Sequence, residues 1–313
     1  SNQETHSGSA CCACLKTPSA SSVGIGQGIL SIDAILRSRL EATSGLLNTV
    51  GARRAFPPLA SLATSLERVL PKKGAGVTTV SVGPEIAAMF ATAAVEVWLR
   101  AVHSFLISAS LTEASPIWAS VSGYYSSHYS IRALAHVLGY FQLFRRKRIV
   151  RWELRGGKHL CSFNPRQSGD REHQFYWKVV KQDAHFASDP LFTGYDPEND
   201  ASDVGHRDRV TYADHICIVP MFRVLDQEAL KQRIRFISQI HFSAPPIPRR
   251  SHFPDVESVQ VVAYHRIVKF RQFLNEIFGG SNRFWNVHRT PSWTSGMINF
   301  QLTEQGGLGS LAN

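Results

Sequence analysis

The stretch SGYYSSHYSIRALAHVLG, from Ser122 to Gly139, decides which fold the chain is expected to adopt. Apolar residues recur along it at helical spacing, and glycine commonly ends a helix, so the sequence predicts an amphipathic helix that stops at Gly139. His128, Arg132 and His136 are spaced four apart and therefore lie one above the other on this helix. Two interpretations of the band stay open: a packed core face whose polar groups satisfy one another, or a shoulder that lines a groove for RNA or a protein.

Helical periodicity continues on both sides of this stretch. Ser115 and Pro116 begin the helix, because serine is a preferred N-cap and proline suits the first helical turn. The preceding segment, 84–111, is apolar nearly all round, which predicts a central helix of the domain. Further helices are expected at 29–50, 57–70, 226–240 and 255–277.

Between the helical segments the pattern changes to one typical of strands. Alternating residues in Ile149–Phe163 surround Gly156–Gly157, which predicts a β-hairpin with a two-residue turn. Gln174–Lys181 is rich in aromatic and β-branched residues and is expected to add a strand. The polar segment 183–209 is expected to be an exposed loop.

These patterns together predict a mainly α-helical bundle with an N-terminal helical extension and a small β-hairpin insert. The expected divisions follow changes in composition along the chain. They are a flexible tail at 1–27, the helical extension at 28–80, the first part of the bundle at 81–145, the hairpin and loop insert at 146–222, the second part of the bundle at 223–280 and a C-terminal coil at 281–313.

The composition indicates a folded, basic protein. Its 313 residues carry a formal net charge of +10, and 43% of them are hydrophobic, which is enough for a real core. Such a charge favours anionic partners, nucleic acid among them. Because no window of ~18 residues is uninterruptedly apolar and no signal peptide is visible, we expect no membrane association. Five cysteines, three of them crowded near the N-terminus, favour a reducing, cytoplasmic setting over a disulfide framework.

The pattern YYxxHYxxRAL, from Tyr124 to Leu134 and closed by Gly139, resembles the YYAxFHAxRALL helix of HEPN-type helical domains. The resemblance covers Pro84–Leu138 and Asp226–Phe278. It implies a small α-helical bundle of the kind found in toxin–antitoxin, nucleotidyltransferase-associated and phage-defence systems. In nuclease members of this family, a later helix carries an arginine that is followed after a few residues by a histidine.

Arg235 and His241 match that pair in this sequence. The resemblance therefore implies a metal-independent ribonuclease, in which Arg235 stabilises the charge that develops on the phosphate and His241 acts as general base. No metal and no cofactor is expected. A structural interpretation stays open, in which Arg235 forms an ion pair and His241 caps the C-terminus of a helix.

A second group of residues is predicted to contact nucleic acid directly. The basic run RRKR precedes the hairpin and Trp152 lies within it, so that positive charge and an aromatic ring occur close together, as a single strand requires. Phe175, Tyr176 and Trp177 would add stacking rings. Alternatively, the tryptophan packs on the helices while the basic side chains face water. The predicted nucleic-acid-binding residues are His128, Arg132, Arg145, Arg146, Lys147, Arg148 and Trp152.

The leading prediction is therefore RNA or single-stranded nucleic-acid binding in a toxin or phage-defence setting. Two alternatives stay open. The pairs His159-x-Cys161 and His215-x-Cys217 would supply a zinc site if their strands lay side by side. The chain would otherwise be a non-catalytic helical subunit of a larger assembly, with its Tyr/His helix face as a protein interface. A protein partner or a homo-oligomer is also expected.

Overall fold

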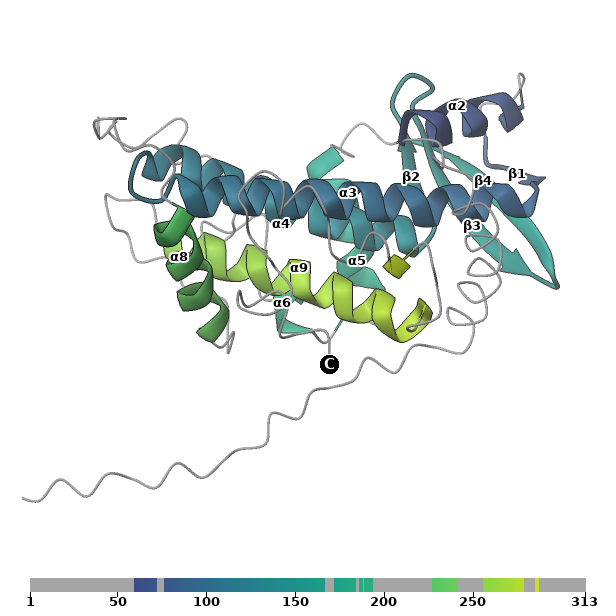
Figure 1. Ribbon diagram of the computed structural model, residues 1–313. Coiled ribbons are helices and arrows are strands. Elements are labelled where there is room, and N and C mark those ends of the chain that lie inside the picture. The colour runs from purple at the N-terminus through teal and green to yellow at the C-terminus, as the bar shows by residue number, and fades with distance from the viewer. Residues whose placement is uncertain are drawn as a thin grey trace, which may run out of the picture. The chain divides into compact units, whose positions relative to one another are not determined.

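The structure is a computed structural model that describes residues 59–71, 76–166, 172–183, 186–187, 189–193, 227–240, 256–278 and 285–286. This part of the chain is mainly helical and contains a four-stranded antiparallel sheet, as Figure 1 shows. The helices are α2 (Leu59–Val69), α3 (Pro84–Ser110), α4 (Pro116–Val137), α5 (Glu172–Gln182), α6 (Pro190–Thr193), α8 (Gln227–Gln239) and α9 (Val256–Phe278). The strands are β1 (Thr78–Ser81), β2 (Tyr140–Leu143), β3 (Arg148–Arg155) and β4 (Lys158–Pro165).

The predicted helix around Ser122–Gly139 is confirmed as α4, and it packs antiparallel to α3. Small side chains allow this close approach: Ser126 Oγ donates to Ala101 O at 2.8 Å, and Ser108 Oγ donates to Ala119 O at 2.6 Å. A Cβ atom added to Gly123 would lie 2.8 Å from Val259 Cγ1 of α9. Only glycine therefore lets α4 and α9 approach to this distance.

Helix α9 completes the helical core against α3 and α4. The indole Nε1 of Trp98 on α3 donates to Ile267 O of α9 at 3.1 Å, and its ring stacks on Phe270 with 5.8 Å between centroids. The indole N–H is thus satisfied although Trp98 is only 2% exposed. The helices expected at 84–111, 226–240 and 255–277 are confirmed as α3, α8 and α9, and the described end of the helix expected at 57–70 is confirmed as α2.

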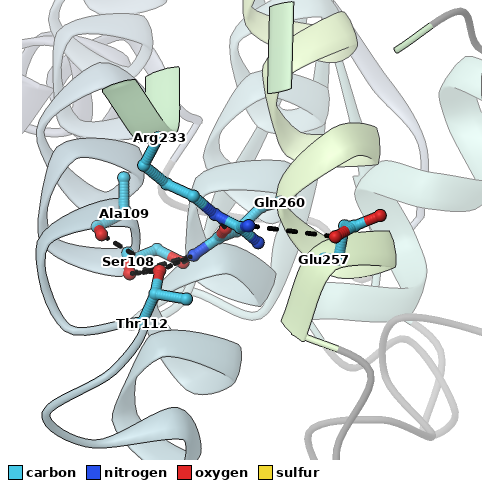
Figure 2. A network of polar contacts seen from close by, with 6 residues as sticks. All are labelled: Ser108, Ala109, Thr112, Arg233, Glu257 and Gln260. Carbon is cyan, nitrogen blue, oxygen red and sulfur yellow. Dashed lines mark hydrogen bonds and ion pairs between the residues drawn. The ribbon is translucent and has the colours of Figure 1, made fainter. Parts of the chain in front are cut away.

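A buried polar network fastens α8 and α9 to the C-terminal end of α3 (Figure 2). Gln260, which is fully buried on α9, donates from Nε2 to Ser108 O at 3.0 Å and to Thr112 Oγ1 at 2.8 Å. Its Oε1 accepts from Arg233 Nε of α8 at 2.9 Å. One amide therefore joins three elements, and its polar atoms are paired although water does not reach them.

The sheet has the strand order β1-β4-β3-β2 and is covered on one face by α2 and the first half of α3. The predicted hairpin is confirmed as β3–β4, with φ of 56° at Gly156 and 71° at Gly157, as the expected two-residue turn requires. The sequence pattern does not predict β1 and β2, which have four residues each and too few alternations to be recognised. The apolar residues of the sheet that pack under the helices are Phe141, Leu143, Val150, Trp152, Cys161 and Phe163.

Two expectations for the region after the hairpin are wrong. The strand expected at Gln174–Lys181 is helix α5, because burial of its aromatic residues against the other helices outweighs their local preference for strands. The described part of the loop expected at 183–209 is not uniformly exposed, since Phe186 and Phe192 are fully buried and contact each other with 5.2 Å between ring centroids.

Among the described residues, α3 is long and apolar enough to cross a membrane, and 67% of its most apolar window is buried in the fold. The core helix of a folded domain has the same composition, so this property alone does not identify a membrane span. The expected absence of a membrane partner stays a prediction. The tail at 1–27 and the helix at 29–50 lie outside the described residues.

Candidate nucleic-acid pocket

A pocket of about 450 Å³ lies where α2, α3 and α4 meet the edge strand β2 and the turn that follows it. Its wall combines apolar side chains with three guanidinium groups, those of Arg100, Arg132 and Arg145. Glu67 of α2 is the acidic residue among the described lining. The remaining described lining residues are Leu59, Ala63, Thr64, Phe141, Gln142, Leu143 and Phe144.

Arg132 is held in a defined orientation at the inner wall of this pocket. Its Nε donates to Nε2 of His136, one turn further along α4, at 3.3 Å. The guanidinium carbon lies 5.3 Å from the ring centroid of Tyr176 on α5, within the range of a cation–π contact. These two contacts use Nε and one face of the guanidinium plane. They restrict the rotamers of a side chain that is only half-buried, which lowers the entropic cost of binding a ligand.

His136 is neutral, and its tautomer follows from its partners. Nδ1 lies 2.8 Å from Tyr140 O, and since a carbonyl can only accept, Nδ1 carries the hydrogen. Nε2 is then the acceptor for Arg132. Complete burial, with a smaller contribution from the Arg132 charge, lowers the pKa of His136 to about 3, while the hydrogen bond to Tyr140 opposes this shift.

The same two side chains that hold Arg132 also close the edge of the sheet. Strand β2 is at the end of the strand order, so its outward backbone groups have no neighbouring strand in the described sheet. His136 donates to Tyr140 O, and the hydroxyl of Tyr176 accepts from the Gln142 backbone N–H at 3.3 Å. The edge is therefore capped by side chains, which hinders pairing with another strand. Because His136 and Tyr176 contact both β2 and Arg132, they also fix the strand relative to Arg132.

Glu96 fixes the opposite wall of the pocket. Its carboxylate accepts from the backbone N–H of Leu59, at the start of α2, at 2.6 Å and from Arg100 at 2.7 Å. The N-terminus of α2 is thus tied to α3, and Arg100 is turned along its own helix. Glu96 offsets the charge of Arg100, so the remaining charged lining residues are Arg132, Arg145 and Glu67.

The turn between β2 and β3 places an aromatic ring and several cations at the mouth of the pocket. Phe144 is 46% exposed and lies under the guanidinium group of Arg166, which is 5.6 Å from the ring centroid. Arg145, Arg146 and Lys147 are exposed on the same turn. Phe144 is absent from the predicted site, although its position directly before the basic run RRKR is a signal that could have identified it.

The structure separates the predicted nucleic-acid-binding residues into a group at or beside the pocket and a group that is buried or half-buried elsewhere. Arg132 and Arg145 line the pocket together, with Arg146 and Lys147 exposed beside it. Arg148 is half-buried and donates to Gly76 O at 3.0 Å. Trp152 and His128 are each 2% exposed.

Burial excludes the predicted stacking role of several rings in this structure. Trp152 packs between β3 and α3, where it stacks on Phe90 with 6.3 Å between centroids. Phe175, Tyr176 and Trp177 are likewise buried on α5. The alternative in which Trp152 packs on the helices and the basic side chains face water matches the observed burial.

The Tyr/His face of α4 is largely covered by α5 of the same chain. The rings of His128 and His173 lie 4.1 Å apart, and the hydroxyl of Tyr124 is 2.7 Å from Nδ1 of His173. Since Tyr124 is fully buried and His128 nearly so, the expectation that these residues form a protein interface is wrong for this part of the face. It becomes part of the core because α5 packs there.

The predicted catalytic pair is only partly visible. Arg235 is exposed on α8, which packs on α3 and α9, and it is not among the described residues that line the pocket. His241 lies outside the described residues. The structure therefore brings Arg132 together with Arg145 and Arg100 rather than with Arg235.

No group of three or more histidine, cysteine, aspartate or glutamate side chains is placed to hold a metal within the described ranges. His159 and Cys161 of the proposed zinc site lie on β4, and His215 and Cys217 fall outside those ranges. Burial raises the pKa of the Cys161 thiol to about 12, so this sulfur is protonated at neutral pH and is a poor metal ligand as it stands.

Comparison of the chain with protein-family models, with curated protein sequences and with solved structures finds no match in any of the three. The functional interpretation consequently depends on the site itself. The resemblance to HEPN-type domains continues to rest on the residues that suggested it.

Proposed function

We propose that this protein binds RNA or another single-stranded nucleic acid through the pocket and the basic turn beside it. The observation that carries the proposal is the convergence of Arg132, Arg145 and the exposed ring of Phe144 around one pocket. Single-strand binding sites combine cations for the phosphates with aromatic rings for the bases. A net charge of +10 would attract such a polyanion at long range.

The physical basis of the proposed contact is the guanidinium fork of Arg132. Phosphate oxygens accept two parallel hydrogen bonds from such a fork, and the geometry is favourable when the fork is already oriented. His136 and Tyr176 provide this orientation before any ligand arrives. Arg145, Arg146 and Lys147 then extend the positive surface along the turn.

The proposal is tested by the salt dependence of binding to a fluorescent single-stranded RNA. Neutralising Arg145, Arg146 and Lys147 together by alanine should weaken binding at least tenfold and reduce the slope of log K against log salt by about 2. The matched control replaces Arg155 and Lys158, at the opposite end of the β3–β4 hairpin, and Lys181 in the last turn of α5, which are also exposed and are not among the described lining residues. An equal loss in both triple variants would indicate attraction without a site, and no binding by the wild-type protein would refute the proposal.

The family resemblance adds a finer proposal, an HEPN-like bundle with metal-independent ribonuclease activity in a toxin or phage-defence system. It is supported by the YYxxHYxxRAL helix and by the position of Arg235 on a helix, at the spacing from His241 that the resemblance requires. Replacing both Arg235 and His241 by alanine should abolish RNA cleavage in a chelating buffer while the unfolding transition stays unchanged. Cleavage by the double variant would refute this activity without affecting the binding proposal.

A further inference from the structure

We infer that the pocket holds one nucleotide of a single strand, with its base against Phe144 and its phosphate on Arg132 and Arg145. This inference rests on the proposed function and adds that the pocket recognises one nucleotide of the bound strand. It predicts that the protein recognises an unstacked nucleotide rather than the continuous backbone of a duplex.

The size of the pocket supports one nucleotide as the unit of recognition. A volume of about 450 Å³ lies in the lower part of the range for sites that enclose one small molecule. A duplex would instead require an extended groove or a protruding element that enters a groove of the nucleic acid. The pocket is bounded on three sides by α2, α3 with α4, and β2, so its contents must be extruded from any base stack.

The chemical character of the pocket wall also supports a nucleotide as the ligand. Leu59 and Ala63 of α2 give the pocket an apolar side, whereas the cations lie on α3, α4 and the turn. An inorganic anion would leave the apolar side without a contact. A nucleotide matches both, because it combines a flat apolar ring system with an anionic group.

Phe144 supplies the surface on which a base can stack. The ring is 46% exposed and lines the pocket directly before Arg145. Arg166 lies over the ring and holds it in place. Base stacking on such a ring contributes to the affinity of single-strand binding sites, so loss of the ring should weaken binding roughly tenfold.

Two variants test the inference in the full-length chain, with fluorescence anisotropy of a short single-stranded RNA as the measurement. Phe144→Ala removes the stacking surface, and Thr64→Trp places a large ring into the pocket from an exposed position of α2. Each should weaken binding by about tenfold. The matched controls are Phe236→Ala, an equally exposed phenylalanine under Arg233 on α8, and Ser81→Trp on β1, which is exposed and not among the described lining residues. Both controls should bind like the wild-type protein.

Competition separates this inference from the proposed function. A nucleoside monophosphate should displace the labelled RNA, whereas inorganic phosphate at the same concentration should not. If the wild-type protein binds RNA but Phe144→Ala and Thr64→Trp bind equally well, or if inorganic phosphate competes equally, the one-nucleotide pocket is wrong and backbone binding stands. If the wild-type protein binds no single strand, the proposed function itself fails.

Discussion

Arg132 and Arg233 each donate a hydrogen bond from Nε to a buried neutral side chain, and they differ in what surrounds them. Arg233 on α8 donates to Gln260 Oε1 at 2.9 Å, and Arg132 on α4 donates to His136 Nε2 at 3.3 Å. Each guanidinium also lies 5.3 Å from an aromatic ring centroid, that of Phe236 or of Tyr176.

The charges around the two guanidinium groups differ. Arg233 lies 3.8 Å from Glu257, and Glu113 also interacts with it, so its charge is compensated within the fold, as Figure 2 shows for Glu257. Burial lowers the pKa of Arg233, and these two carboxylates oppose that shift. Arg132 instead lines a pocket together with Arg145, with the carboxylate of Glu67, and with Arg100, which is paired with Glu96. The same pair of contacts, an Nε hydrogen bond and an aromatic ring, thus occurs in the packed core at Arg233 and at the wall of a pocket at Arg132.

The largest expected effect comes from removing the acceptor of the packed arginine. Gln260→Leu would remove the buried hydrogen bonds that the amide makes with Arg233 Nε, Ser108 O and Thr112 Oγ1. We expect the free energy of unfolding to fall by about 3 kcal/mol, because buried polar groups lose hydrogen bonds that water cannot replace. Urea unfolding followed by circular dichroism measures it, with exposed Arg235→Ala as the control. A loss no larger than that of the control would show that the network is not stabilising.

The next largest effects should distinguish the two arginines: Arg132 should matter for RNA affinity, and Arg233 should matter for stability. Arg132→Ala should weaken binding of single-stranded RNA by about thirtyfold, close to 2 kcal/mol, with a smaller effect on unfolding. Arg233→Ala should do the reverse and lower stability with nearly unchanged affinity. Arg132→Lys should restore only part of the affinity, because an ammonium group has no planar fork. Equal behaviour of the two alanine variants in both measurements would contradict the distinction.

The acceptor His136 should add a dependence of stability on pH. Its pKa is about 3 in the folded protein and 6.5 when exposed, so between these values the unfolded chain binds the extra proton. The free energy of unfolding is therefore unaffected by protonation of His136 above pH 6.5, and it decreases by up to about 1.4 kcal/mol for each pH unit below that value. Unfolding free energies of the wild-type protein and His136→Gln, measured from pH 7.5 to pH 4.5 in steps of about one unit, should differ in slope by this amount. Parallel curves would show that His136 is not buried in its neutral form.

The smallest expected effect concerns the single carboxylate of the described lining. Glu67→Gln removes a negative charge from the pocket without changing its shape, so affinity for RNA should rise by about twofold to threefold at low salt. Glu113→Gln is the matched control near Arg233 and should leave affinity unchanged. Weaker binding by Glu67→Gln would instead indicate that the carboxylate contacts the ligand.

The helices could be predicted because their signals are local. Pro116 begins α4, and the apolar period extends to its end, so the sequence is sufficient to place this element. Helix α5 could not be predicted, since Phe175, Tyr176 and Trp177 favour strands locally and become helical only through burial against α4 and α9. Of the predicted nucleic-acid-binding residues, Arg132 and Arg145 line the pocket, whereas Trp152 is buried. Phe144 also lines the pocket and is not among the predicted residues.

The sequence alone determined that His128, Arg132 and His136 lie on one side of a helix, because backbone hydrogen bonding sets that period. It did not determine which of them meets solvent. His128 is buried against His173, His136 is buried against the edge of β2, and Arg132 between them lines a pocket. Burial depends on which distant segments cover each turn of the helix, and α2, α5 and the sheet take these positions only when the whole chain folds.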